Sequence, residues 1–136
     1  MIQYYLSAIL LLHHLGTIIA VKGKDDFANV TFGSAVKLYN RKRDVRLHSH
    51  EVKYGSGSGQ QSVTGTPEPD DTNSYWVVTC PHGVTSLTCE RGVAVKCDDV
   101  IRLRHQATRL NLHSHHYESP LTQKQEVSAY GDKGTY

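Results

Sequence analysis

A large net charge is the first thing that the sequence lacks. Its 15 basic and 13 acidic residues leave a formal net charge of +2. That is too small to generate the long-range positive field of a nucleic-acid-binding protein. A short basic run, Arg41–Arg43, has no aromatic residues interleaved with it and is typical of a solvated turn. The composition therefore argues against a nucleic-acid partner.

Short motifs of catalysis and metal binding are also missing. The sequence contains no Cys-x-x-Cys pair, no HExxH, no P-loop and no G-x-S-x-G elbow, which place ligands or a nucleophile at fixed spacings. The adjacent carboxylates Asp70 and Asp71 follow a proline and are typical of a solvated loop. We therefore predict no enzymatic activity, no metal site and no cofactor.

Long hydrophobic runs are absent except at the N-terminus. Residues 2–20 are mostly apolar, and a charged run at residues 22–26 ends them abruptly. His13 and His14 interrupt a segment already short for the roughly 20 apolar residues that span a bilayer. A cleaved signal peptide over residues 1–23 is thus favoured over a signal anchor. We predict entry into the secretory pathway, with no stable membrane insertion after cleavage.

Cysteine is scarce, and the count is odd. In an oxidising compartment Cys80, Cys89 and Cys97 could form disulfides, but three cysteines leave at least one without a partner in this chain. A Cys80–Cys89 pair would close a small loop, and Cys97 could await a partner elsewhere; the pairing stays open. Asn29 begins an Asn-Val-Thr sequon, which predicts a lumenal glycan unless the motif occurs by chance.

An internal repeat is the most informative feature that is present. Residues 36–50 align with residues 101–115 at a shift of 65 without a gap, and both blocks end in Leu-His-Ser-His. Residues 61–64 align with residues 125–128 at a shift of 64. A period shared by two separate blocks indicates duplication. We predict one unit over residues 32–96 and a second over residues 97–136, which stops before a full pitch.

The repeated unit has the pattern of β-structure. Apolar and polar residues alternate in short runs, as expected of strands with one buried face, and the short polar stretches between the runs suit hairpin turns. A glycine-serine loop occupies residues 54–59, and residues 73–78 indicate a closing strand. We predict an all-β fold with about four short strands per unit, whose core anchors are Leu47, Leu112 and Trp76.

Longer stretches of the chain resemble a known family. Residues 45–65 and 70–76, followed by residues 89–92 and 112–131, are similar to stromal cell-derived factor 2 proteins, a family with the MIR domain. The resemblance covers nearly everything after Thr31 and implies that residues 24–136 form part of a β-trefoil of three four-stranded units. One departure lies at Phe32, where the family has a cysteine, so the family's usual disulfide scheme does not transfer.

The resemblance also implies a function. Family members are lumenal proteins of the endoplasmic reticulum, linked to a J-domain co-chaperone and BiP, that keep unfolded client proteins from aggregating. Their retrieval signal is not present in this sequence. We therefore expect a chaperone-associated binding module. The alternative is a glycan-binding or protein O-mannosyltransferase-accessory module, because MIR domains also occur in those polytopic enzymes.

The repeated histidines are the candidate contact residues. The members of each pair, two positions apart on a strand, share one face. Four such nitrogens could bind zinc, but duplicated strand packing explains the spacing equally well and no cysteine or carboxylate spacing supports a metal. Ser49 points to the opposite face and cannot form a nucleophile–base pair. We expect partner or glycan contacts on an exposed loop rim at His48, His50, Tyr54, Gln60, His113 and His115.

Overall fold

The computed structural model describes residues 28–84 and 89–131. The predicted signal peptide lies outside these residues. Within them the chain forms β-strands and a short 3-10 turn, without an α-helix. The described residues therefore contain no helix long and apolar enough to cross a membrane. The prediction of an all-β fold is confirmed.

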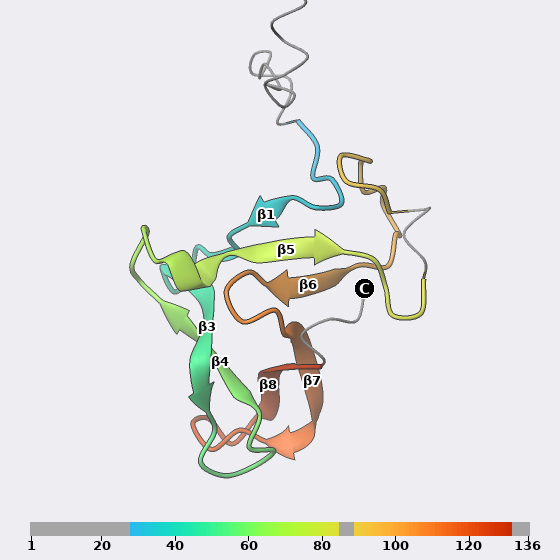
Figure 1. Ribbon diagram of the computed structural model, residues 1–136. Coiled ribbons are helices and arrows are strands. Elements are labelled where there is room, and N and C mark those ends of the chain that lie inside the picture. Colours follow the sequence, from blue (N-terminus) through green and yellow to red (C-terminus); the bar gives the residue numbers. More distant parts are fainter. Residues whose placement is uncertain (1–27, 85–88, 132–136) are drawn as a thin grey trace, which may run out of the picture.

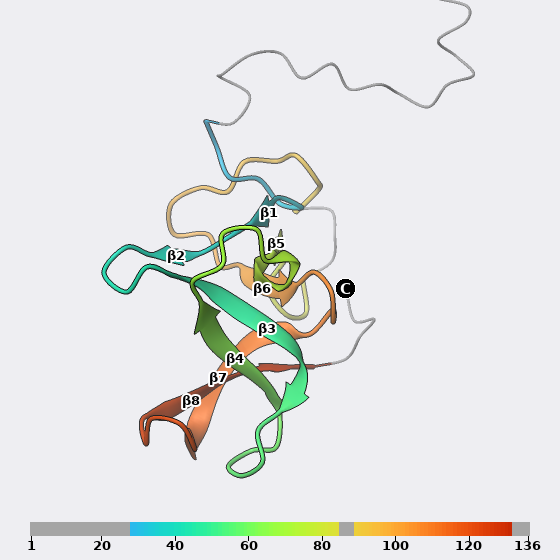
Figure 2. The ribbon, with the colours of Figure 1, turned by 90° about the vertical axis from the view of Figure 1, so that its left-hand side faces the viewer.

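Eight strands form one curled sheet (Figures 1 and 2). Their spatial order is β1-β5-β6-β7-β8-β4-β3-β2, and the pairs are antiparallel. The strands are β1 (Ala35–Val36), β2 (Tyr39–Asn40), β3 (Val45–Lys53), β4 (Gln61–Thr66), β5 (Trp76–Thr79), β6 (Arg102–His105), β7 (Asn111–Glu118) and β8 (Gln125–Tyr130).

The duplication predicted from the sequence is present in the strand register. Leu47 in β3 faces Gly65 in β4, and Leu112 in β7 faces Ala129 in β8. The first strands are thus related by a shift of 65 and the second strands by 64, as in the sequence. Both hairpins also shift register at the same place, after Ser49 and after Ser114. The two hairpins are copies of one structural element.

The predicted closing strand is shorter than expected. Thr72–Ser74 forms a 3-10 turn, and the strand begins at Trp76. The cause is the Asp71 side chain, which accepts a hydrogen bond from the Asn73 N–H at the start of the turn. Such a cap satisfies backbone donors that a strand would need to pair with a neighbour.

Trp76 lies at the centre of the core. Its side chain is fully buried, and its Nε1–H donates to the Leu47 carbonyl at 3.0 Å, so the indole buries its large apolar surface without leaving its donor unpaired. Val63 and Ala129 complete the buried cluster, and the partly buried Val36, Leu47, Leu103, Leu110 and Leu112 pack against it.

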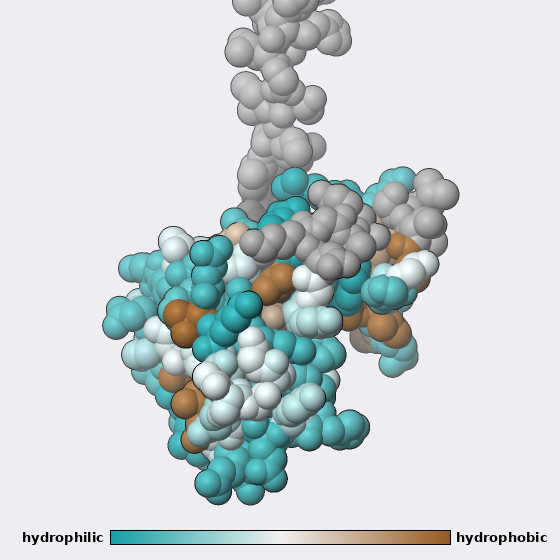
Figure 3. All heavy atoms as spheres, turned by 60° about the horizontal axis from the view of Figure 1, so that its bottom comes forward, coloured by the Kyte–Doolittle hydropathy of each residue, from teal (hydrophilic) through white to brown (hydrophobic). Residues whose placement is uncertain are grey.

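The two hairpins are not equally covered. Val63 on β4 is 8% exposed, whereas its repeat equivalent Val127 on β8 is 38% exposed. Ser49 is buried, whereas Ser114 is exposed. An open groove of about 690 Å³, lined by Leu38, Val45, Val63 and Val127 among others, follows this side of the sheet. On the face seen in Figure 3, hydrophobic residues form separate patches among hydrophilic ones.

Candidate functional site

The paired histidines share a face in each hairpin, as predicted. The ring centroids of His48 and His50 lie 5.1 Å apart, and those of His113 and His115 lie 5.0 Å apart. The two pairs do not meet, because β8 and β4 separate β7 from β3 in the sheet. Among the described residues no group of three or more His, Cys, Asp or Glu side chains is placed to hold a metal ion.

His48 forms the first of two histidine–carboxylate pairs. Its Nδ1 lies 2.8 Å from Asp71 Oδ2, and both side chains are mostly buried. Burial by itself would raise the pKa of Asp71, but hydrogen bonds from Ser74, His48 and the Asn73 N–H lower that pKa below its usual value. The carboxylate therefore remains ionised and holds β3 against the 3-10 turn.

This arrangement contains a serine, a carboxylate and an imidazole, but in the wrong order for catalysis. The Ser74 hydroxyl donates to the Asp71 carboxylate, not to the His48 ring. In acyl transfer the imidazole must lie between the two so that it can take the proton from the hydroxyl. Ser74 is also fully buried, so a substrate could not reach it.

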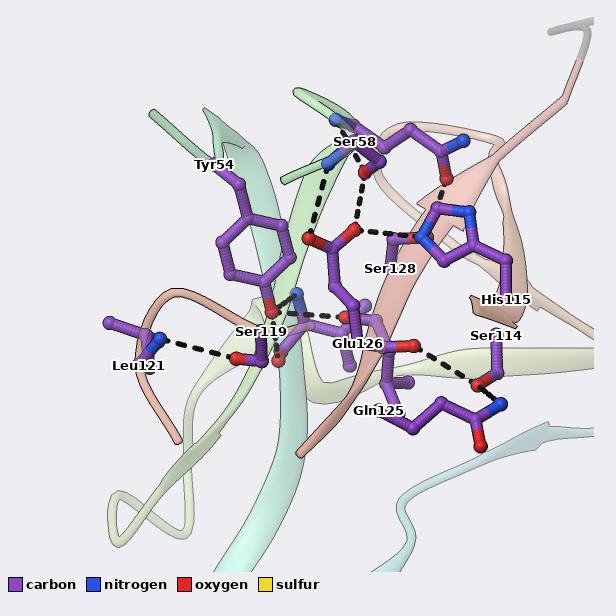
Figure 4. Close-up of polar contacts among 12 residues, drawn as sticks. Tyr54, Ser58, Ser114, His115, Ser119, Leu121, Gln125, Glu126 and Ser128 are labelled. Atoms are coloured by element: carbon purple, nitrogen blue, oxygen red, sulfur yellow. Dashed lines mark hydrogen bonds and ion pairs between the residues drawn. The ribbon is translucent and has the colours of Figure 1, made fainter. Parts of the chain in front are cut away.

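His115 forms the second pair, with a carboxylate that is completely buried. Its Nε2 lies 2.8 Å from Glu126 Oε1, and the Ser58 hydroxyl and the Ser58 N–H both donate to the same carboxylate (Figure 4). Burial alone would raise the pKa of Glu126, but the bonds from Ser58 and His115 lower it. Because Ser58 belongs to the glycine-serine loop of the first unit, this carboxylate joins the two units.

Tyr54 strengthens the same junction. Its hydroxyl lies 3.1 Å from the Val63 carbonyl on β4 and 3.0 Å from the Val127 carbonyl on β8, and burial raises the pKa of the phenol. The Ser128 hydroxyl donates to Gln60 Oε1 at 2.6 Å. The rim position expected for Tyr54 is wrong, because the residue is 9% exposed. The loop at residues 54–60, which the sequence suggested as an exposed contact rim, instead connects the two hairpins through these hydrogen bonds.

A buried polar chain through His105 is the feature that sequence analysis missed. Gln61 Nε2 donates to Ser49 Oγ at 2.8 Å and to Thr108 Oγ1 at 2.9 Å. His105 Nδ1 contacts the Thr108 hydroxyl and N–H, and Nε2 lies 2.9 Å from the Asn73 carbonyl.

A neutral imidazole with its proton on Nε2 satisfies all these contacts of His105, and burial lowers the pKa of this ring. At a shift of 65, His105 and Thr108 align with Asn40 and Arg43. The two copies therefore differ at both positions, and the repeat contains no signal for this chain of hydrogen bonds.

The remaining predicted residues are placed as follows. Cys80 and Cys89 form a disulfide, and Cys97 is exposed and free. Asn29 is exposed, so its position is compatible with a glycan, and glycosylation stays a prediction. His50 is exposed, and His113 is half-buried. Contact roles for these histidines also stay predictions.

Comparison with known proteins decides the family. The family model described as the MIR domain matches residues 23–135, which is most of the chain. The chain belongs to the MIR-domain family. In this MIR-domain chain, the duplicated hairpins and the partial β-trefoil have the architecture that the resemblance implied.

The similar proteins belong to the stromal cell-derived factor 2 group. Stromal cell-derived factor 2 of Mus musculus is 54% identical over 127 residues, which are 93% of this chain and 59% of the mouse protein. The crystal structure of the SDF2-like protein from Arabidopsis thaliana superposes with a TM-score of 0.70 at 53% identity, covering 76% of this chain and 56% of that one. The MIR-domain chain thus spans little more than half the length of these relatives.

A more distant likeness concerns the fold alone. A chain of the S. cerevisiae protein O-mannosyltransferase Pmt1–Pmt2 complex, bound to the sugar donor, superposes with a TM-score of 0.64 at 24% identity. The superposition covers 96% of this MIR-domain chain and 20% of the yeast chain. The same β-architecture therefore occurs within a much larger enzyme.

Proposed function

We propose that this chain is a non-catalytic binding module of the endoplasmic reticulum lumen, acting with a J-domain co-chaperone and BiP in the folding and quality control of client proteins. The observation that supports this proposal most strongly is the 54% identity to stromal cell-derived factor 2 across 93% of the chain. The matched 127 residues extend over both repeat units and are not confined to one of them.

The internal chemistry of the described residues agrees with a binding role. Both histidine–carboxylate pairs and the His105 chain are built into contacts between strands, turns and units. The Glu126 and His105 side chains are fully buried and Asp71 is mostly buried, so a substrate has little access to these groups. The histidines that remain available to a partner are the exposed His50 and the half-buried His113.

The compartment is tested through Asn29. If the N-terminal segment directs the chain into the lumen, the exposed Asn29 should carry an oligosaccharide when the protein is made in cells. Removal of glycans with endoglycosidase H should then increase mobility in gel electrophoresis, and Asn29→Gln should abolish that shift. A secreted form with glycans resistant to the enzyme would contradict residence in the endoplasmic reticulum.

Binding to chaperones is tested directly with purified components. The chain should bind a lumenal J-domain protein in calorimetry and slow the aggregation of a reduced, unfolded client in light scattering. The double variant His50→Ala/His113→Ala should weaken that binding, whereas His116→Ala, an exposed histidine on the same strand as His113, should not. Absence of binding by the unmodified chain would refute the chaperone role; unchanged binding by the double variant would refute the histidine contacts.

A glycan-binding role is the second candidate, and one observation favours it. On β7 and β8 four rings follow one another in the order Tyr130, His113, His115 and Tyr117, with neighbouring centroids 5.0–5.5 Å apart. Tyr117 and Tyr130 are 55% and 56% exposed, so their apolar ring faces are accessible to a ligand with both polar and apolar sides, such as a sugar.

Titration with mannose oligosaccharides tests the glycan-binding role. Saturable binding lost in Tyr117→Ala/Tyr130→Ala and retained in Tyr39→Ala, an exposed tyrosine on β2, would support a glycan site. A flat titration of the unmodified chain would dismiss this candidate and leave the chaperone role standing.

A further inference from the structure

A second groove is lined by residues of β1, β5 and β6 and of the loops beside them. It has a volume of about 840 Å³, within the usual range for ligand sites. The strand register explains its position. Trp76 and His105 face each other and are both buried, so the next pair along, Val77 and Arg104, must point to the opposite side of the sheet.

Arginine dominates the charge of this groove. Arg91, Arg102, Arg104 and Arg109 line it, and its described lining contains no acidic residue. Within the described part of the chain, the ion pairs do not include Arg91, Arg102 or Arg109. Guanidinium groups keep their charge at any ordinary pH, so this local excess of positive charge cannot be relieved by deprotonation.

Two of these arginines are held in place by the surrounding backbone. Arg102 Nε donates to the Cys80 carbonyl at 2.6 Å, next to the Cys80–Cys89 disulfide. The stem of Arg91 packs on Gly33 so closely that a Cβ at that position would lie 2.7 Å from Arg91 Cγ. Ordered stems reduce the entropy lost when a guanidinium group binds an anion.

The spacing of the charges suits an extended ligand better than a compact one. Arg102 and Arg104 occupy alternate positions on β6, so their Cα atoms are separated by about 6.6 Å along the strand. Alternate side chains of an extended peptide have the same spacing. The apolar lining residues Phe32, Val77 and Val84 provide contacts for side chains between the charges.

We propose that this groove binds an extended acidic peptide segment with carboxylates at alternate positions, through forked contacts from the arginines. The inference deepens the proposed function, on which it rests, because it names the kind of segment that a partner or client would present. It also differs from the histidine contacts, since the groove lies on β1, β5 and β6 and not on the two duplicated hairpins.

Fluorescence anisotropy with a labelled peptide of alternating glutamate and valine tests the proposal. The unmodified chain should bind it saturably, and the affinity should fall as salt rises. Arg104→Gln/Arg109→Gln should weaken binding about tenfold, since each exposed ion pair contributes up to about fivefold. Arg41→Gln/Arg43→Gln, which removes two exposed arginines outside the groove, should leave the affinity unchanged. Equal circular dichroism spectra would show that the variants fold.

Three results would overturn the inference. A peptide of alternating glutamine and valine could bind with equal affinity, or the groove variant could bind as well as the unmodified chain. Inorganic phosphate at equal charge concentration could also compete completely, which would indicate a compact anion site.

Failure of this inference is distinguishable from failure of the proposed function. A chain that binds the J-domain protein but not the acidic peptide refutes only the groove. A chain that binds the peptide but not the J-domain protein refutes only the chaperone role.

Discussion

Glu126 is the residue that most directly joins the two repeat units. Its carboxylate is completely buried and accepts hydrogen bonds from Ser58 in one unit while contacting His115 in the other. Such a group is stable without solvent only while these partners remain in place. Because hydrogen bonds are directional and apolar packing is not, Glu126 fixes the orientation of the two units more specifically than apolar packing alone would.

Glu126→Gln should lower the free energy of unfolding by about 2 kcal/mol at pH 7, because a charge-assisted set of bonds is replaced by an imperfectly matched amide. Urea denaturation measures the change, and Glu118→Gln, an exposed glutamate, is the control. Since the pKa of Glu126 is lowered in the folded state, its contribution is present above pH 4.5 and lost as the pH falls through the lowered value. A variant that stayed equally weakened in strong acid would contradict this assignment.

His105 should make stability depend on pH in a higher range. Its pKa is lowered from 6.5 by burial, so below pH 6.5 the unfolded chain gains a proton that the folded chain resists. The free energy of unfolding should therefore fall between pH 7 and pH 5, by at most about 1.4 kcal/mol per pH unit from this group.

Denaturation of His105→Gln, which removes the titrating group but keeps a donor and an acceptor, should show a weaker pH dependence in that range. His82→Gln, an exposed histidine, should behave like the unmodified chain. Identical profiles for all three proteins would exclude His105 as the source.

At the scale of elements, the duplicated hairpin contains its own hydrogen-bonded motif. The Ser49 hydroxyl donates to the Ser62 carbonyl, and the Ser114 hydroxyl to the Glu126 carbonyl, at 2.8 Å and 3.0 Å. In each copy a glutamine amide donates to that serine, from Gln61 and from Gln125. The motif depends on positions within one hairpin, and it forms in both copies whatever surrounds them.

The glycine-serine loop between β3 and β4 requires glycine at two positions. Gly57 has φ of +73°, and a Cβ there would lie 2.5 Å from Glu126 Oε2; Gly59 has φ of +66° with open space around it. Gly59→Ala should cost about 1 kcal/mol from backbone strain alone. Gly57→Ala should cost clearly more, because it also displaces the buried carboxylate. Thermal unfolding measures the stability of both variants. Equal losses of stability would show that the contact between Gly57 and Glu126 does not constrain the loop.

At the scale of the whole molecule, equivalent residues lie in different environments. Both Val63 and Val127 border the open groove, but Val63 belongs to the core cluster and is 8% exposed, whereas Val127 lies outside that cluster and is 38% exposed. Val63→Ala should lower the free energy of unfolding by about 2 kcal/mol through lost burial and a residual cavity. Val127→Ala, the same change in the second copy, should cost less than half as much. Equal costs in chemical denaturation would mean that the side of β8 facing the groove is covered in solution.

The sequence by itself determined what is local to each repeat. Alternation, turn composition and the two shifts of 65 and 64 predicted the strands and their duplication, because those features depend on neighbours within one unit. The anchors Leu47, Leu112 and Trp76 were predicted from their apolar side chains alone, and the structure packs them into a core shared by both units. Only the tertiary structure decided which copy of each residue is buried. Tyr54, His105 and Glu126 acquire their partners from another element or unit, and no pattern within a hairpin specifies what will pack against it.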